Sequence, residues 1–132
     1  MVRKYFLSDL QDISLDIQPG DIIFLHGDLA SGKTTLSKHI IGNILWISDE
    51  VISPTYTYYN KYWKNIYHFD LYRLSNYDEF FAIWWEEILE NSDNISLIEW
   101  PEIIGKYFSP TIEIFLRKTQ NEDEREIEII RK

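Results

Sequence analysis

The sequence predicts an α/β fold with a mostly parallel central sheet that is flanked by helices and ends in an antiparallel hairpin. A continuous apolar run at residues 22–26, and a similar pattern at residues 95–99 that ends in an acid, are typical of strands buried on both faces of a parallel sheet. Apolar and polar residues alternate over 111–116 and again over 125–130, with a polar segment between them. This pattern predicts two antiparallel strands joined as a hairpin.

Length and composition limit the classes of protein to consider. A chain of 132 residues predicts one domain spanning 1–132. The absence of cysteine excludes a disulfide framework, a thiolate zinc site and a cysteine nucleophile. No apolar stretch approaches about 18 residues, and the N-terminus lacks the apolar run of a signal peptide. We therefore expect a cytoplasmic protein that does not bind membranes.

The negative charge is concentrated in one segment. The chain carries 13 Lys and Arg against 22 Asp and Glu, for a net charge of −9. Residues 78–102 hold eight of these carboxylates and no Lys or Arg. Such a surface repels phosphate backbones, which argues against unaided binding of nucleic acid. The acids form either a solvated helix face or a surface that docks on a basic partner.

The N-terminal third is expected to contain a strand, a loop and a helix. Residues 4–17 fit two interpretations, because Ser8 and Gln11 have the spacing of a helix cap whereas apolar residues alternate over 13–17 as in a strand. After the buried run at 22–26 comes a glycine-containing loop. Residues 33–41 then have the apolar spacing of a helix.

The middle of the chain predicts further strands. A short strand is expected around Val51. Residues 55–72 are dense in β-branched and aromatic side chains, with the polar pair Lys64 and Asn65 in their middle. This arrangement predicts two strands that meet in a hairpin.

Two helices are expected beside these strands. One begins at Ser75 or Asn76 and runs to about Glu90, with apolar residues at helical spacing. The other is short and runs from Pro101 to about Tyr107, because proline is favoured at the first position of a helix.

The most specific pattern lies between the first buried strand and the helix. Residues 27–34 read GDLASGKT and match G-x-x-x-x-G-K-[ST] at every fixed position. This phosphate-binding loop predicts a P-loop NTPase-like fold, in which backbone N–H groups surround the phosphates. Lys33 is expected to reach the β- and γ-phosphates, Thr34 to bind Mg²⁺, and Thr35 to bond the α-phosphate. The residues expected to bind ATP are Gly27, Asp28, Leu29, Ala30, Ser31, Gly32, Lys33, Thr34 and Thr35.

Two acids could complete a magnesium site. Glu99 closes one hydrophobic strand and Asp70 closes another. Either can hold Mg²⁺, directly or through water, while the other orients or activates the attacking water. The segment Ser53-Pro54-Thr55 lies between the loop and these acids. It is either a switch that senses the γ-phosphate or an ordinary proline turn.

Four motifs together resemble one family. GDLASGKTT, SPTYTYYNKY, HFDLYRL and IEWPE occur in this order and spacing, and the chain is similar to the TsaE family from about Gly20 to Glu102. The closing hairpin with Arg125 also resembles that family. TsaE proteins are bacterial P-loop ATPases needed to make N6-threonylcarbamoyladenosine in tRNA. Trp84, where a glycine is expected, and the short segment before Ile22 depart from the family.

The resemblance implies a role for individual residues. Thr34 and Glu99 are expected to hold Mg²⁺, and Asp70 to be essential for hydrolysis. Ser53 and Thr55 belong to the implied switch, and Trp100 lies beside the site. In the implied mechanism, Lys33 holds the phosphates while Asp70 and Thr55 position the attacking water.

The resemblance also implies partners. TsaD and TsaB form the assembly in which ATP hydrolysis drives the cycle. In that assembly tRNA is reached only indirectly, through the complex. Hydrolysis by the chain alone is expected to be weak.

Three other functions remain as alternatives. A small-molecule or nucleotide kinase would share the loop, but it needs cations to clamp the phosphoryl group, and three of the five arginines fall in the last 16 residues. A GTPase is disfavoured because residues 60–63 read NKYW and lack the acid that reads guanine. The aromatic stretch 56–72 could stack RNA bases, although aromatic packing across a hairpin explains it better.

Overall fold

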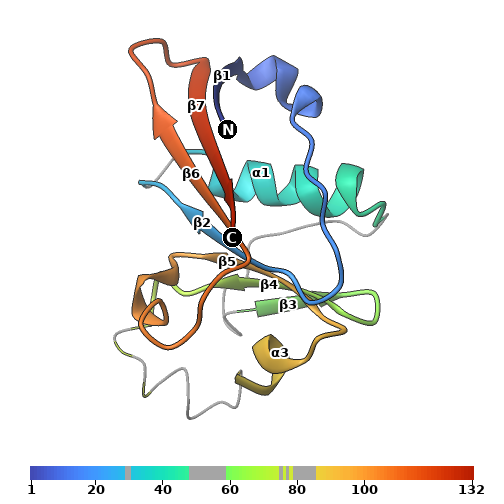
Figure 1. Ribbon diagram of the computed structural model, residues 1–132. Helices are drawn as coiled ribbons and strands as arrows, with labels where there is room; N and C mark the ends of the chain where they lie inside the picture. Colours follow the sequence, from blue (N-terminus) through green and yellow to red (C-terminus); the bar gives the residue numbers. More distant parts are fainter. Residues whose placement is uncertain (29–30, 48–58, 75, 77, 79–85) are drawn as a thin grey trace.

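The computed structural model describes residues 1–28, 31–47, 59–74, 76, 78 and 86–132, and these residues form one seven-stranded sheet with helices beside it (Figure 1). The strands are β1 (Val2–Phe6), β2 (Ile22–His26), β3 (Tyr59–Tyr62), β4 (Ile66–Asp70), β5 (Ile95–Glu99), β6 (Ile112–Lys118) and β7 (Glu124–Arg131). The helical elements are α1 (Lys33–His39), α3 (Glu86–Glu90), the 3₁₀ helices η1 (Leu7–Asp12) and η3 (Pro101–Ile103), and the π-helix η2 (Ile40–Ile44).

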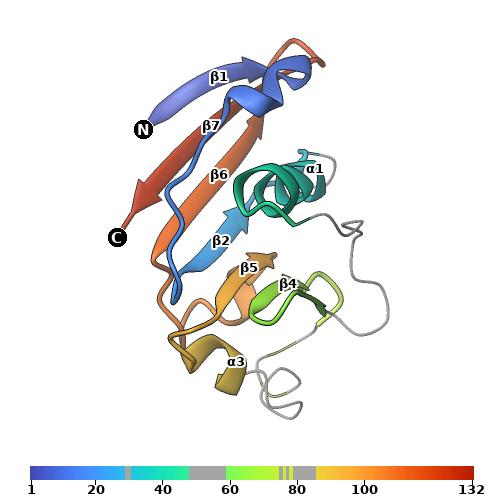
Figure 2. The same ribbon diagram turned by 90° about the vertical axis from the view of Figure 1, so that its right-hand side faces the viewer.

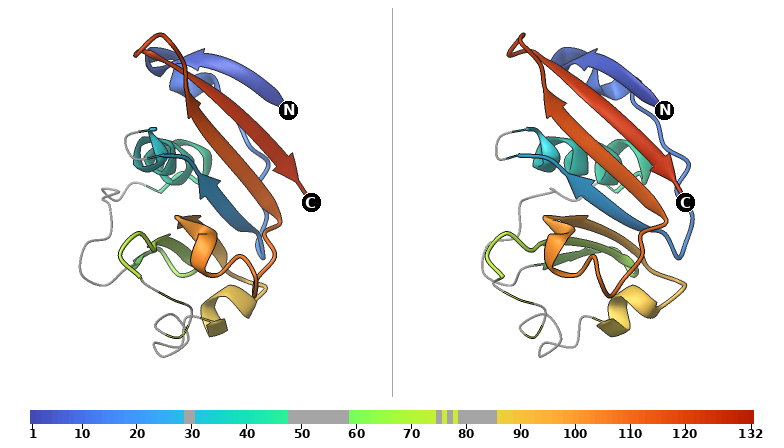
Figure 3. Two further views of the ribbon diagram at one scale, coloured as in Figure 1. Left: turned by 90° about the vertical axis from the view of Figure 1, so that its left-hand side faces the viewer. Right: turned by 60° about the vertical axis from the view of Figure 1, so that its left-hand side comes forward.

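The sheet is parallel in its middle and antiparallel at both edges. Its order is β1-β7-β6-β2-β5-β4-β3. The four strands β6, β2, β5 and β4 run parallel, whereas β7, β1 and β3 are antiparallel to their neighbours. Figure 3 shows β1 lying along the outer side of the β6–β7 hairpin. The predicted P-loop NTPase-like α/β fold and its C-terminal antiparallel hairpin are confirmed.

Each face of the sheet has its own apolar core, because successive strand residues point to opposite faces. On one face, Leu36 of α1 and Ile40 of η2 pack in a cluster with Leu97 of β5. On the other face, Leu89 of α3 packs in a cluster with Phe69 of β4. Figure 2 shows α1 and α3 on these opposite sides. All five residues of β5 are buried, as the continuous apolar run predicted.

The N-terminal segment matches neither interpretation of residues 4–17, because its strand lies at Val2–Phe6 and its helical part is a 3₁₀ helix that begins at Leu7. It begins as β1 and continues as η1, but Ser8 provides no cap, because the residue before η1 is Phe6 and its side chain makes no capping hydrogen bond. The alternating residues after η1 form no strand. Ile13 is nevertheless buried, and its carbonyl oxygen contacts the ring of His39 at 2.6 Å.

Two predicted helix lengths are corrected. The helix expected over 33–41 continues as a π-helix to Ile44, where the N–H of Leu45 bonds the carbonyl of Ile40 at 2.8 Å. The helix expected from Pro101 to about Tyr107 is wrong beyond Ile103. The N–H groups of Tyr107 and Phe108 both bond the carbonyl of Ile104, which ends the helical repeat and turns the chain toward β6.

The central hairpin is confirmed, with β3 and β4 meeting around residues 63–65. The strand expected around Val51 lies outside the described residues, as does most of the helix expected before Glu90, of which α3 is described. In the part of the chain that the structure describes, no helix is both long and apolar enough to cross a membrane.

Candidate functional site

The phosphate-loop sequence joins the end of β2 to the start of α1, and its two glycines are required by geometry. A Cβ on Gly27 would lie 2.5 Å from the Ser31 hydroxyl oxygen and 2.9 Å from the carbonyl oxygen of Leu116. Gly32 precedes α1 with φ of 105°, a left-handed conformation that side chains disfavour. Leu29 and Ala30 lie outside the described residues.

A pocket of about 410 Å³ opens beside this loop, which is within the usual size of a ligand site. It brings together most of the described residues predicted for the site, from the loop and from the carboxyl ends of β4 and β5. The lining residues are Leu7, Ser31, Gly32, Lys33, Thr34, Thr35, Asp70, Tyr72, Glu99, Trp100 and Arg125.

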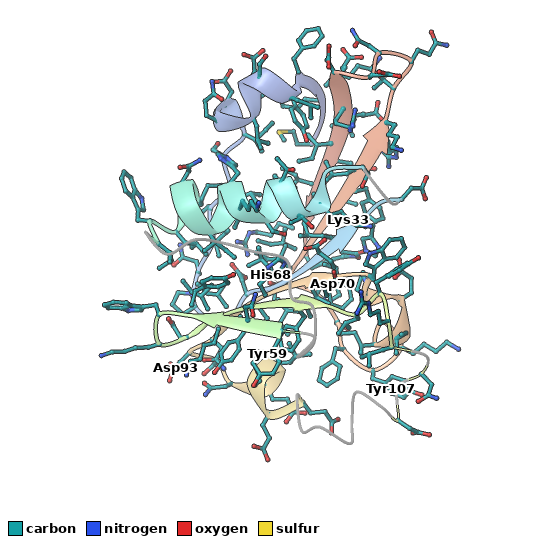
Figure 4. The ribbon with its side chains drawn as sticks, turned by 180° about the vertical axis from the view of Figure 1, so that it is seen from behind. Lys33, Tyr59, His68, Asp70, Asp93 and Tyr107 are labelled. Carbon is teal, nitrogen blue, oxygen red and sulfur yellow. The ribbon has the colours of Figure 1, made fainter. Side chains whose placement is uncertain are left out.

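Lys33 is the buried cation of the pocket, with only 5% of its surface exposed. Its ammonium donates to the carbonyl of Gly27 and lies 3.4 Å from the centre of the Trp100 ring. Burial lowers the pKa of Lys33, although the nearby carboxylates of Glu99, Glu102 and Asp70 oppose that shift. Figure 4 shows Lys33 and Asp70 gathered where α1 begins and β4 ends.

The two candidate acids are neighbours in the sheet, since Asp70 is paired with Glu99 in the parallel register of β4 and β5. Burial raises the pKa of Asp70, and the charge of Glu99 adds to this effect. The N–H of Tyr72 donates to Asp70 at 3.1 Å. A carboxylate with a raised pKa at the edge of a pocket is suited to accepting a proton or orienting water.

Glu99 is the acid that lies against the loop threonine. The Thr34 hydroxyl donates to Glu99 Oε1 at 3.2 Å. A hydroxyl and a carboxylate are hard oxygen ligands of the kind that Mg²⁺ prefers. The loop also fits a phosphate group, because Gly27 leaves no room for a side chain and the Ser31 hydroxyl is buried with no hydrogen-bond partner in the described part of the chain.

Trp100 lies at the pocket wall in an unusual backbone conformation. Its φ of 58° is left-handed, at the residue that precedes η3. Its ring lies 4.9 Å from the ring of Tyr72, centre to centre. The turn after β5 therefore holds an aromatic side chain over Lys33.

Several residues in contact with the site were not predicted as site residues. Leu7 and Tyr72 line the pocket, and His68 and Arg125 contact predicted site residues. His68 Nε2 lies 2.5 Å from Glu99 Oε2, and His68 is completely buried. The alternation of β4 could have indicated it, because His68 and Asp70 are two residues apart and share a face. Arg125 donates to the Ser31 carbonyl at 3.0 Å, so one of the three arginines in the last 16 residues reaches the loop.

Other predictions fall outside this pocket or outside the described residues. Ser53 and Thr55, the predicted switch, are not described, and neither is Trp84. Asp28 does not line the pocket. Tyr59 packs against Tyr67 and Phe69 across the β3–β4 hairpin at 6.0 and 5.4 Å between ring centres, as cross-strand packing predicts. No cluster of three or more His, Asp or Glu side chains suited to a metal occurs among the described residues.

Known proteins show whether the four motifs reflect membership of the TsaE family. The model of the family described as "Threonylcarbamoyl adenosine biosynthesis protein TsaE" matches residues 7–127. The chain belongs to the TsaE family. The match covers the phosphate loop, both acids and all of β6 with the first half of β7, so the predicted membership is confirmed.

Relatives and a solved structure agree with this assignment. The chain is 37% identical over 110 residues to the tRNA threonylcarbamoyladenosine biosynthesis protein TsaE of Rickettsia prowazekii, covering 80% of this chain and 75% of that protein. It is 38% identical over 121 residues to the Haemophilus influenzae protein of the same name, covering 89% and 75%. The crystal structure of Bacillus subtilis YdiB superposes with a TM-score of 0.69 and 25% identity, covering 96% of this chain and 84% of YdiB.

Proposed function

We propose that this TsaE-family protein binds ATP with Mg²⁺ and hydrolyses it within a complex that makes N6-threonylcarbamoyladenosine in tRNA. The observation that carries the proposal is the convergence of Lys33, Thr34, Glu99 and Asp70 on one pocket beside a complete phosphate-binding loop. Hydrolysis by the chain alone is expected to be weak, and the proposed location is the cytoplasm.

The proposed roles follow from what each side chain contacts. Mg²⁺, when bound with ATP, neutralises charge that develops on the phosphates. Thr34 and Glu99 are the residues that would hold this ion, because their oxygen atoms lie 3.2 Å apart. Lys33 binds the β- and γ-phosphates. Asp70, with its raised pKa, orients the attacking water, and Thr55 assists it from the proposed switch that includes Ser53.

We propose TsaD and TsaB as the partners, with tRNA reached only through them. The exposed acids of residues 78–102 support a protein partner over direct contact with RNA. Those that the structure describes are Asp78, Glu87, Glu90, Asp93 and Glu102. Docking of these acids on a basic partner should weaken as salt is raised. An affinity that does not change with salt would contradict a role for these acids in docking.

A kinase remains the second candidate, and Arg125 is the observation that favours it. Its guanidinium reaches the phosphate loop, where a kinase needs a cation. However, it also donates to the carbonyls of Glu122 and Glu124 at 2.8 Å. Three of its N–H groups are thus occupied by backbone oxygen atoms, which suits a structural tie better than a phosphate clamp.

Reconstitution tests the proposed function. The protein and ATP are added to TsaB and TsaD with threonylcarbamoyl-adenylate and tRNA, and modified tRNA is counted per complex. We expect multiple turnovers that are lost with Lys33→Ala and kept with Lys38→Ala, an exposed lysine of the same helix. A failure of the unaltered protein to stimulate turnover would contradict the proposal. Transfer of the γ-phosphate to a small molecule in place of water would favour the kinase.

A further inference from the structure

His68 has no task in the proposed mechanism, yet it makes the shortest side-chain contact of the candidate metal ligand. Its Nε2 lies 2.5 Å from Glu99 Oε2, and neither side chain has more than 3% of its surface exposed. Ser37, also completely buried, is the second neighbour of the same oxygen, at 3.5 Å. Figure 4 shows His68 close to Asp70, beneath α1.

The two oxygen atoms of Glu99 therefore have different surroundings. Oε2 lies among buried groups, with His68 and Ser37 beside it. Oε1 accepts from the Thr34 hydroxyl, and Thr34 lines the pocket. A carboxylate held by one oxygen atom cannot rotate freely, so its other oxygen atom keeps one direction.

The hydrogen bond also determines which ring nitrogen of His68 carries a proton. A carboxylate only accepts, so Nε2 must donate. Nδ1 has no hydrogen-bond partner among the described residues. Carboxylates that ligate metals are themselves commonly held by hydrogen bonds from outside the metal site.

The other two histidines show what a purely structural histidine looks like here. His39 lies 2.6 Å from the carbonyl of Ile13 and 3.1 Å from the side chain of Asn43, so both of its nitrogen atoms serve local structure. His26 pairs with Glu113 at 2.9 Å, but that pair is partly exposed and outside the pocket. His68 differs because its partner is a pocket residue.

We propose that His68 is a positioning residue, which holds Glu99 by Oε2 so that Oε1 is directed toward Thr34 and the magnesium ion. The proposal rests on the proposed function, because it assumes that the nucleotide binds with Mg²⁺. It adds a residue that never touches nucleotide or metal and acts only through Glu99.

Paired variants separate positioning from packing. His68→Met fills similar volume but cannot donate, whereas His68→Gln keeps an amide N–H near the position of Nε2. His26→Gln is the matched control, since it alters a histidine–carboxylate pair outside the pocket. The measurement is the affinity for a fluorescent ADP analogue, first in EDTA and then as Mg²⁺ is titrated.

In EDTA, all three variants should bind the analogue as the unaltered protein does, which also verifies that they fold. His68→Met should need about 10–100-fold more Mg²⁺ to reach the tight-binding state. His68→Gln should need only slightly more Mg²⁺ than the unaltered protein, and His26→Gln should need no more than it does. An unchanged Mg²⁺ requirement in His68→Met would overturn the proposal. An equal increase of the Mg²⁺ requirement in His68→Met and His68→Gln would also overturn it. Absence of any Mg²⁺ effect in the unaltered protein would instead contradict the proposed function.

A second measurement does not depend on the variants. Nuclear magnetic resonance of the unaltered protein should find the His68 proton on Nε2. Its resonance should shift when ADP is added with Mg²⁺ but not when ADP is added with EDTA. A proton on Nδ1 alone, or a resonance that Mg²⁺ does not move, would overturn the proposal even if His68→Met fails to fold.

Discussion

The two ends of the central parallel strands hold their carboxylates in opposite ways. At the amino ends, Asp21 precedes β2 and is only 5% exposed. It accepts from the Thr111 hydroxyl at 2.7 Å, the Gln18 N–H at 2.8 Å and Arg131 at 3.0 Å. Burial alone would raise the pKa of Asp21, but these hydrogen bonds together bring it below its usual value.

At the carboxyl ends, several charged groups lie close together, and their contacts do not fully compensate for their burial. Burial raises the pKa of Asp70, which stands beside Glu99 in the sheet. Burial lowers the pKa of Lys33. The hydroxyl of Ser31 has no hydrogen-bond partner in the described part of the chain. The carboxylate at the amino ends therefore stabilises the fold. The charged groups at the carboxyl ends destabilise it, but they are placed where they can act on a ligand.

The largest effect is expected from removing the cation of the carboxyl end. Lys33→Ala should abolish ATP turnover, because no other lysine lines the described pocket. Stability should not fall much, since a desolvated ammonium is removed along with its contacts. Phosphate release and thermal unfolding measure the two properties. Lys38→Ala should match the unaltered protein in both, and turnover that survives Lys33→Ala would remove Lys33 from the mechanism.

Asp70→Asn should separate binding from hydrolysis. We expect hydrolysis to fall by about 10²–10⁴-fold while MgATP binding is largely kept, because a positioned base is lost. Ionised Asp70 destabilises the fold above its raised pKa, so the unfolding free energy of the Asn variant at pH 7 should be higher. Single-turnover hydrolysis and denaturant titration test this, with exposed Asp93→Asn as the control. Retained hydrolysis would exclude a catalytic role for Asp70.

Asp21→Asn should have the reverse result, a loss of stability with normal hydrolysis. Weakening its charged hydrogen bonds should reduce the unfolding free energy by about 1–3 kcal/mol at neutral pH. The pKa of Asp21 is lowered by folding, so its stabilisation is fully present above about pH 4 and is lost as pH falls through the folded value. The difference from the unaltered protein should thus shrink in acid. Asp12→Asn, at an exposed site, should change nothing, and a pH-independent deficit would contradict the assigned role.

The smallest effect concerns two tryptophans with the same backbone strain. Trp63, in the turn between β3 and β4, has φ of 56° and is 71% exposed, whereas Trp100 has φ of 58° in the pocket wall. Asparagine tolerates this conformation, so Trp63→Asn should stabilise the protein by about 1 kcal/mol without changing ATP binding. Trp63→Phe keeps the strain and serves as the control. Trp100→Asn should weaken ATP binding, and equal outcomes at the two sites would show that Trp100 has no special task.

Local sequence patterns predicted most of the strands and the phosphate loop. Apolar runs mark β2 and β5 because both faces of these strands are covered, and alternation marks β6 and β7 because one face is more open. The glycines of the loop are predictable because a side chain would clash at Gly27 and because the left-handed φ of Gly32 disfavours any side chain. The π-helix after α1 was not predictable, since the same apolar spacing fits either kind of helix.

The contacts that join distant segments could not be predicted. Arg125 reaches Ser31 because β6 runs parallel to β2, so β7 begins at the edge of the sheet where the phosphate loop begins. Sequence spacing does not reveal that order of strands. The partner of His68 depends on the register of β4 against β5. His68 and Glu99 are 31 positions apart in the sequence, and the residues between them carry no signal of that register.

The most direct test of the account is a crystal structure with ADP, Mg²⁺ and a fluoride mimic of the γ-phosphate. We expect phosphates in the loop that begins at Gly27, contacts from Lys33, and Mg²⁺ held by Thr34 and by Glu99 directly or through water. Asp70 should lie next to the water that faces the mimic. A nucleotide bound in another pocket, or Mg²⁺ held by Asp70 with Glu99 uninvolved, would contradict it.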